Sequence, residues 1–169
     1  MNPTGKKNIA LSLRSVEEKD MKKLFLWRNH PEIRKYFFNN EPVVWDEHEK
    51  WFHDKINDPG SKIYIAIDKD RCIGTIRFEN RGDIVKCSVM VDPDCIGHGY
   101  GTKIIALGTK KYLAQTQTSK GIIAEVRVDN IRSLKAFQKA GFITKYVTLA
   151  YSHRNGYFIS QHESFEEME

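Results

Sequence analysis

The chain has 169 residues, of which 40% are hydrophobic and 29% charged, with a formal net charge of +5. Such a composition is typical of one soluble globular domain, and no apolar run approaches the roughly 18 residues of a membrane span. Lysine and arginine alternate with acidic residues along the whole chain instead of forming a dense basic stretch with aromatics. We therefore expect neither nucleic acid nor a membrane as a partner.

Residues 1–8 are polar and contain no apolar segment, which favours a flexible tail before a single domain over residues 9–165. The three cysteines, Cys72, Cys87 and Cys95, are odd in number and lack CxxC spacing. This pattern argues against a disulfide framework and against a metal site. A cytoplasmic protein is the expectation.

The first part of the chain predicts one strand followed by helices. Alternation over 11–14 indicates the strand, and helical spacing follows over 15–29 and, after Pro31, over 30–38. A second amphipathic helix is expected over 46–56 with Asp46 as its N-cap.

Three strands at hairpin spacing are predicted next, over 63–68, 72–80 and 84–91. A long helix over 102–116, a strand over 122–128, a helix over 131–140 and an aromatic-rich strand pair over 142–152 and 157–163 complete the pattern. This order predicts a mixed α/β domain in which an antiparallel meander precedes two crossover units.

The most informative segment joins the third meander strand to the long helix. Gly97, Gly99 and Gly101 occupy every second position directly before Thr102, where that helix is expected to start. Free amides and the helix dipole favour anions at such a place, and glycines let a phosphate approach the main chain. The segment predicts a phosphate-binding loop, with a tight turn that binds no ligand as the alternative.

Two common phosphate motifs do not fit this segment. A dinucleotide fingerprint would need a third glycine where Thr102 stands, and a P-loop would need lysine before threonine, the reverse of Thr102-Lys103.

Two motifs together resemble the GNAT superfamily of N-acetyltransferases. The coenzyme A motif of that family, R/Q-x-x-G-x-G/A, is matched at Gly99 and Gly101, although Ile96 stands where Arg or Gln is expected. The second signature appears as Asn130-Ile131-Arg132-Ser133 followed by Phe137-Gln138-Lys139-Ala140-Gly141-Phe142. The resemblance implies a twisted, mostly antiparallel central sheet with a splayed parallel strand pair and flanking helices.

The resemblance also implies acetyl-CoA as cosubstrate, with no metal, and a set of binding residues. A bulge at Val89, Met90 and Val91 would open the strand pair, and their main chain would pair with the pantetheine arm. The pyrophosphate would bind the amides of Ile96, Gly97, His98, Gly99, Tyr100, Gly101 and Thr102, with the His98 side chain as a bystander. The second motif would contribute Asn130, Ser133, Phe137 and Lys139, although Lys139 and Lys135 also fit a solvated helix face.

Acyl transfer to an amine is helped by a base, for which Glu125 is the first candidate and Glu79 the second. Ser88 is a candidate for positioning a water molecule. The alternative for Glu125 is an ion pair with Arg127 on the same strand. Many family members have a tyrosine acid where this chain has Phe137, so that role is either absent or taken by another group or by water.

The expected acceptor site includes Trp27, Arg28, Asn29, His48 and Trp51. This combination resembles the N-acetyltransferases of nucleotide-linked 4-amino sugars, of the pseudaminic-acid pathway type, in which Arg28 or Arg34 would meet the pyrophosphate. The alternatives are a ribosomal-protein-type N-terminal acetyltransferase and a catalytically silent module that binds acetyl-CoA. Pairing of the aromatic C-terminal strands is compatible with a homodimer.

Overall fold

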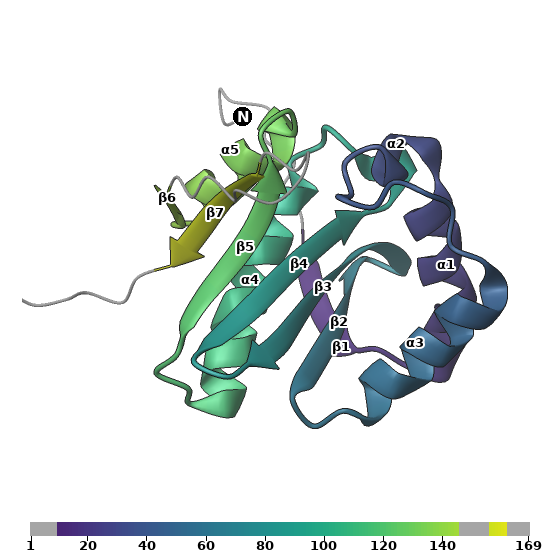
Figure 1. The fold of residues 1–169 in the computed structure, drawn as a ribbon, viewed down its shortest axis with the longest axis horizontal. Coiled ribbons are helices and arrows are strands. Elements are labelled where there is room, and N and C mark those ends of the chain that lie inside the picture. The colour runs from purple at the N-terminus through teal and green to yellow at the C-terminus, as the bar shows by residue number, and fades with distance from the viewer. Residues whose placement is uncertain (1–9, 146–155, 162–169) are drawn as a thin grey trace, which may run out of the picture.

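A computed structural model describes residues 10–145 and 156–161 of the chain. Within these residues, seven strands form one sheet, in the order β1-β2-β3-β4-β5-β7-β6 (Figure 1). The strands are β1 Leu11–Ser15, β2 Ser61–Asp68, β3 Arg71–Arg81, β4 Ile84–Val91, β5 Gly121–Arg127, β6 Ile143–Lys145 and β7 Gly156–Gln161. The helices are α1 Met21–Asn29, α2 Pro31–Arg34, α3 Trp45–Asn57, α4 Tyr100–Thr116 and α5 Ile131–Lys139, with the short 3-10 turns η1 Glu18–Asp20 and η2 Pro93–Cys95.

Every neighbouring pair in the sheet is antiparallel except β4 and β5, which confirms the predicted mixed fold. Strands β1 to β4 form the meander, and α4 crosses over to place β5 parallel to β4. The second crossover differs from a simple repeat, because β7 is inserted between β5 and β6. The C-terminal strands therefore extend this sheet.

Helices cover both faces of the sheet (Figure 1). Alternation along the strands sends one set of side chains toward α4 and α5 and the other toward α1 and α3. The first core contains Tyr64, Ile76, Phe78, Val85, Ile104, Ile105, Tyr112, Ile122 and Phe137. The second contains Met21, Leu24, Trp27, Phe52 and Ile65.

Helix α4 does not bury all of its large apolar side chains. Ile104 and Ile105 are buried, but Leu107 is 39% exposed. Gly108 is buried in its place, and a Cβ atom added there would lie 2.7 Å from Ile76 Cγ2. The glycine therefore lets the helix pack close to β3.

We expect Gly108→Val to lower the free energy of unfolding by about 2 kcal/mol, because overpacking a dense core costs roughly 1–3 kcal/mol. Urea unfolding followed by circular dichroism measures the change. The exposed Ala106→Val on the same helix controls for β-branching and should cost well under about 1 kcal/mol. Equal losses in the two variants would show that close packing at Gly108 is unimportant.

The parallel pairing of β4 and β5 is short. It covers Ile84–Lys86 of β4 and ends at the pair Lys86↔Ile123, although both strands continue beyond it. The splayed pair implied by the family resemblance is therefore present. The bulge expected at Val89 is not, because β4 keeps an unbroken register with β3, and the register shift of the meander lies instead at Ala66/Ile67 of β2.

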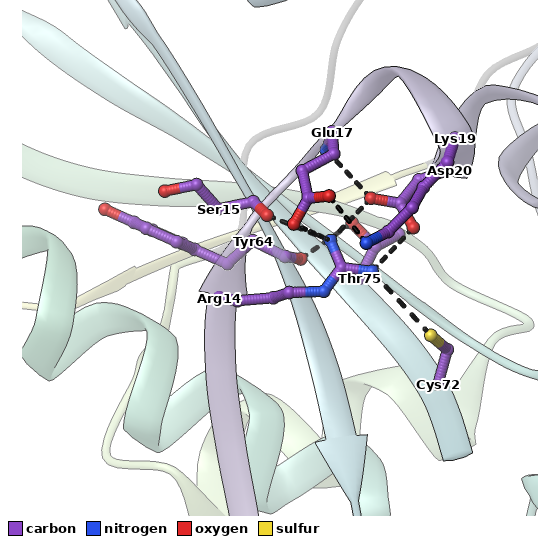
Figure 2. Close-up of polar contacts among 8 residues, drawn as sticks. All are labelled: Arg14, Ser15, Glu17, Lys19, Asp20, Tyr64, Cys72 and Thr75. Atoms are coloured by element: carbon purple, nitrogen blue, oxygen red, sulfur yellow. Dashed lines mark hydrogen bonds and ion pairs between the residues drawn. The ribbon is translucent and has the colours of Figure 1, made fainter. Parts of the chain in front are cut away.

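An ion pair fixes the first strand to the turn that precedes α1. The Arg14 guanidinium donates to both carboxylate oxygens of Asp20, at 2.6 and 2.7 Å (Figure 2). Burial alone would raise the pKa of Asp20, but the hydrogen bonds from Arg14 and from the Glu17 amide hold it below its usual value. This bonded turn is the reason that α1 begins at Met21 and not at Ser15.

The start of α3, like that of α1, differs from the sequence prediction. Helix α3 begins at Trp45 after an extended Val44, so Asp46 lies in the first turn and is not the N-cap. The predicted tail over 1–8 and the outer parts of the two predicted C-terminal strands lie outside the described residues. Among the described helices, none is long and apolar enough to cross a membrane.

Candidate functional site

The segment between β4 and α4 is a compact loop that turns at glycines. Asp92 accepts a hydrogen bond from the Asp94 amide at 3.0 Å, which starts η2. Gly97 and Gly99 then adopt φ angles of 86° and 82°, values that favour glycine. A Cβ atom added to either would meet no heavy atom within 4 Å. The main chain is therefore open at both glycines.

The N-terminus of α4 is not capped by a side chain. The helix begins at Tyr100, earlier than the predicted Thr102, and its N-cap is Gly99. The first amides of an α-helix have no acceptor within the helix. The N–H groups of Tyr100, Gly101 and Thr102 therefore remain, with the helix dipole, to bind an anion.

The set of amides predicted to bind phosphate needs one correction. The Ile96 amide donates to the Pro93 carbonyl at 3.4 Å, which removes Ile96 from the set and leaves residues 97–102. The side chain of His98 is exposed, which agrees with a position beside the loop main chain.

Two polar contacts tie this loop to the turn between β2 and β3. The Tyr100 hydroxyl donates to Asp68 Oδ2 at 2.5 Å, and Arg71 reaches Asp92 at 3.2 Å and Asp94 at 3.4 Å. The Arg71 contacts hold the start of the loop at η2, and the Tyr100 contact holds its end at the first residue of α4. The amides are thereby positioned before any ligand arrives.

We expect Tyr100→Phe to raise the KM for acetyl-CoA about tenfold or more with little change in kcat, because a hydrogen bond to a charged group is worth roughly 1.5–3 kcal/mol. The matched control is Tyr64→Phe, which removes a hydroxyl bonded to Gln115 near the other end of α4. Steady-state kinetics measure both. If both variants shift the KM equally, Tyr100 has no particular role in positioning the loop.

The edge of β4 that faces β5 is open beyond Lys86. Residues 87–91 pair with β3 on their other side, and no described strand pairs with them on this one. Val89 and Val91 pack against the core beneath α4, and Met90 packs against the core beneath α1. The free main chain of Val89, Met90 and Val91 is the feature that the pantetheine prediction requires.

The second motif builds helix α5. Asn130 caps the helix by accepting a hydrogen bond from the Ser133 amide at 3.2 Å. Phe137 is 2% exposed and packs edge-on against Phe142 with ring centroids 5.0 Å apart. Lys139 is exposed. The motif therefore has a structural role of its own, and Phe137 belongs to the core.

Glu125 lies on β5 just past the last residue paired with β4. Its carboxylate accepts a hydrogen bond from Lys86 Nζ at 2.8 Å, and its side chain is 27% exposed. The ion pair with Arg127 that the sequence suggests is not formed, because Arg127 bonds Asp129 at 2.7 Å. Glu125 is thus a half-buried carboxylate at the start of the splay.

Glu79 is buried in a cluster of cations. Its carboxylate lies 2.7 Å from Lys55, 3.1 Å from Arg81 and 3.7 Å from Arg77. Burial would raise the pKa of Glu79, but these three charges hold it below its usual value. A carboxylate stabilised in its ionised form in this way is a weak base, which favours Glu125 over Glu79.

Ser88 stands directly opposite Arg77 in the β3–β4 ladder. Opposite residues of an antiparallel pair share a face, so both lie on the α3 side of the sheet. Arg77 and Lys55 were not predicted from the sequence. The available signal was a charged residue, Arg77, between the buried Ile76 and Phe78 of one strand.

Three residues predicted to bind the acceptor instead build the α1–α3 layer. Trp27 is 6% exposed in the second core. Asn29 bonds both backbone groups of Val43 at 2.8 Å, and the buried His48 ring bonds the Met21 carbonyl at 2.9 Å. These contacts give Trp27, Asn29 and His48 a structural role within the α1–α3 layer.

Arg28 and Trp51 have more accessible side chains. The Arg28 guanidinium lies 4.0 Å from the Phe37 ring centroid and donates to the Asn39 carbonyl at 2.8 Å. Trp51 is half-buried, with the Arg77 guanidinium 5.0 Å from its ring centroid. Both remain candidates for acceptor contacts.

Helices α2 and α5 lie at the end of the sheet where β4 finishes (Figure 1). The pKa of Glu32 on α2 is lowered first by its bond to Lys35, and the charge of Arg132 on α5 contributes to the same shift. The first turn of α5 is therefore near α2, beside the opening between β4 and β5. Among the described residues, no group of three His, Cys, Asp or Glu side chains could hold a metal.

Comparison with known proteins agrees with this geometry. A family model described as an acetyltransferase (GNAT) domain matches residues 10–143. An uncharacterised protein of Methanocaldococcus jannaschii is 26% identical over 134 residues, which cover 77% of this chain and 27% of that protein. The chain thus spans about a quarter of the length of that relative.

Solved structures share the fold at low sequence identity. A domain from Methanocaldococcus jannaschii superposes with a TM-score of 0.75 at 22% identity, covering 90% of this chain and 98% of that one. Spermidine N-acetyltransferase from Vibrio cholerae, in complex with CoA and spermine, gives 0.76 at 19%, covering 89% and 92%. AAC(6')-Ib in complex with ribostamycin and coenzyme A gives 0.73 at 19%, covering 88% and 92%.

Proposed function

The chain belongs to the GNAT family of acetyltransferases, and we propose that it transfers the acetyl group of acetyl-CoA to the 4-amino group of a UDP-linked amino-deoxy sugar. One observation carries the acetyl-CoA part of this proposal. The uncapped N-terminus of α4 directly follows the strand whose edge is open beyond Lys86. A ligand with a diphosphate at one end and an amide-containing arm at the other suits both features.

In this proposal the amides of residues 97–102 bind the pyrophosphate, and the open edge of β4 binds the pantetheine arm. Asn130, the N-cap of α5, contacts the pantetheine with Ser133 beside it, and Lys139 near the end of α5 is a candidate for the adenosine phosphates. An amide near Val89 then stabilises the oxyanion of the tetrahedral intermediate. The acetyl carbon is bound near the middle of β4.

Glu125 takes a proton from the attacking amine, directly or through a water molecule that Ser88 positions. The thiolate is an acceptable leaving group because thiol pKa values lie near 8.5. Phe137, which stands where many relatives have an acid, has no hydroxyl, so we propose that water protonates the thiolate.

The charge of the α3 side of the sheet supports an anionic acceptor. Its two central carboxylates, Glu79 and Glu125, are both bonded to cations. A polycation such as spermine, the ligand of the Vibrio cholerae structure, would need free carboxylates at this place. A nucleotide-linked sugar instead brings a diphosphate. Arg28 on α1 and Arg34 on α2 are candidates for binding it.

The test is release of free thiol from acetyl-CoA with three acceptor classes: UDP-linked 4-amino sugars, spermidine, and peptides with free N-termini. We expect turnover with the first class, at least about tenfold above the others in kcat/KM. Turnover confined to the peptides would replace the proposal with the ribosomal-protein type of activity. Tight coenzyme A binding without turnover of any amine would favour a silent binding module, for which Phe137 is the supporting residue.

A further inference from the structure

Arg77 is a cation inside the layer between β3 and α3. Its side chain is 26% exposed, its guanidinium lies 5.0 Å from the ring centroid of Trp51, and its Nε atom is buried without a hydrogen-bond partner. The nearest carboxylate oxygen belongs to Glu79, at 3.7 Å from Nε, too far for a hydrogen bond. Arg77 thus lies over an aromatic ring and is partly desolvated, and no described residue accepts a hydrogen bond from it.

The carboxylate of Glu79 is already occupied by other partners. Its Oε1 atom bonds Lys55 at 2.7 Å and its Oε2 atom bonds Arg81 at 3.1 Å. Three cations therefore surround one anion, and the local charge is positive. Burial lowers the pKa of Arg77, but a guanidinium stays protonated in proteins, so the cost of its desolvation is not compensated within the cluster.

The position of Arg77 along the sheet relates it to the proposed reaction. Arg77 pairs with Ser88, which lies just beyond Lys86, the last residue of β4 paired with β5. The open edge of β4 therefore starts beside Arg77. On the same face, Glu125 of β5 bonds Lys86. The arginine thus lies close to the residues that we propose for the chemistry.

We propose that Arg77, whose guanidinium lies over the Trp51 ring, is a binding residue for a phosphate group of the acceptor. This inference rests on the proposed function and deepens it, because it assigns the recognition of the diphosphate to a residue near the reacting amine. A guanidinium can donate two parallel hydrogen bonds to phosphate oxygens, and the exposed 26% of the Arg77 side chain is the part that a phosphate would reach. The contact with the Trp51 ring restricts the guanidinium before binding, which reduces the side-chain entropy lost when a phosphate binds.

The first experiment compares Arg77→Met with Arg81→Met. Each variant removes one cation near Glu79, but only the first removes the guanidinium that lies over the Trp51 ring. We expect Arg77→Met to raise the KM for the UDP-linked amino sugar about tenfold or more, with an unchanged KM for acetyl-CoA. Arg81→Met should stay within about twofold of wild type for both substrates. Equal acceptor KM values in wild type and Arg77→Met would overturn the inference.

A second variant, Arg77→Lys, keeps the charge but not the two parallel donors. Its acceptor KM should lie between those of wild type and Arg77→Met. This variant also serves if Arg77→Met does not fold, which circular dichroism detects. A wild-type acceptor KM in Arg77→Lys would then count against recognition by the guanidinium.

A second measurement decides the case in which no UDP-linked sugar is turned over and the proposed function fails. Binding of inorganic pyrophosphate is measured by calorimetry on protein saturated with coenzyme A, so that the loop before α4 is already filled. Binding that is present in wild type and Arg81→Met but lost in Arg77→Met would support a phosphate site at Arg77. No binding to wild type, or equal binding to all three proteins, would overturn it.

Discussion

Replacing Gly99 with glutamate is expected to weaken acetyl-CoA binding by roughly 100-fold or more, because charge-assisted hydrogen bonds to phosphate are worth about 1.5–3 kcal/mol each. Gly99 has a φ of 82° and is the N-cap of α4. A side chain at this position would extend into space that is now open. Its carboxylate would lie beside the amides proposed to bind the pyrophosphate and would repel it. Calorimetry with acetyl-CoA measures the loss.

The control for this prediction must separate charge from backbone strain. Gly82, in the turn between β3 and β4, has a φ of 74° and equally open surroundings. Gly82→Glu therefore introduces the same strain and the same charge away from α4 and should leave acetyl-CoA affinity within about twofold of wild type. Gly99→Ala adds strain alone and should have an intermediate affinity. Unchanged affinity in Gly99→Glu would place the pyrophosphate elsewhere.

The sheet could be predicted well from the sequence because its signals are local. Strand β4 matches its predicted bounds, and the turn residues between β2, β3 and β4 mark the meander. Asn130 caps α5, and Gly141 with a φ of 96° follows its end; both residue types are common at these positions. Helix starts were less accurate, since the first turns of α1 and α3 depend on Arg14–Asp20 pairing and on the extended Val44, which are tertiary effects.

One part of the candidate site was predictable from the sequence and the other was not. The glycine loop was predictable because main-chain amides need only glycines and a helix start, both of which are visible in the sequence. The acceptor side was not, because Trp27, Asn29 and His48 have side chains that suit a ligand and a core equally well. Only the packing of α1 against α3 decides between these uses. Arg77 was missed because an arginine on a strand gives no local sign of its partners.

The pairing of charges on the α3 side also required the structure. The sequence predicts Glu125 as a base, with an ion pair to Arg127 as the alternative. In the structure Glu125 bonds Lys86, the last residue of β4 that is paired with β5. That contact fixes the carboxylate at the start of the splay, which is the place that a base for the proposed reaction requires. It also gives Glu125 a structural role, so the two roles must be separated by experiment.

Glu125→Ala is expected to lower kcat about 100-fold or more, because general base catalysis contributes roughly 10²- to 10⁴-fold. The KM for acetyl-CoA should change less than about threefold, since Glu125 lies away from the loop before α4. Steady-state assays measure both parameters.

Lys86→Met provides the matched control, because it breaks the same ion pair and leaves the carboxylate in place. If Glu125 is the base, Lys86→Met should lose less than about tenfold in kcat, from poorer positioning of the carboxylate. If Glu125 only joins β4 to β5, the two variants should lose activity to the same extent. In that event the proton must leave the amine through water alone, and the open edge of β4 would be the main catalytic contribution of the sheet.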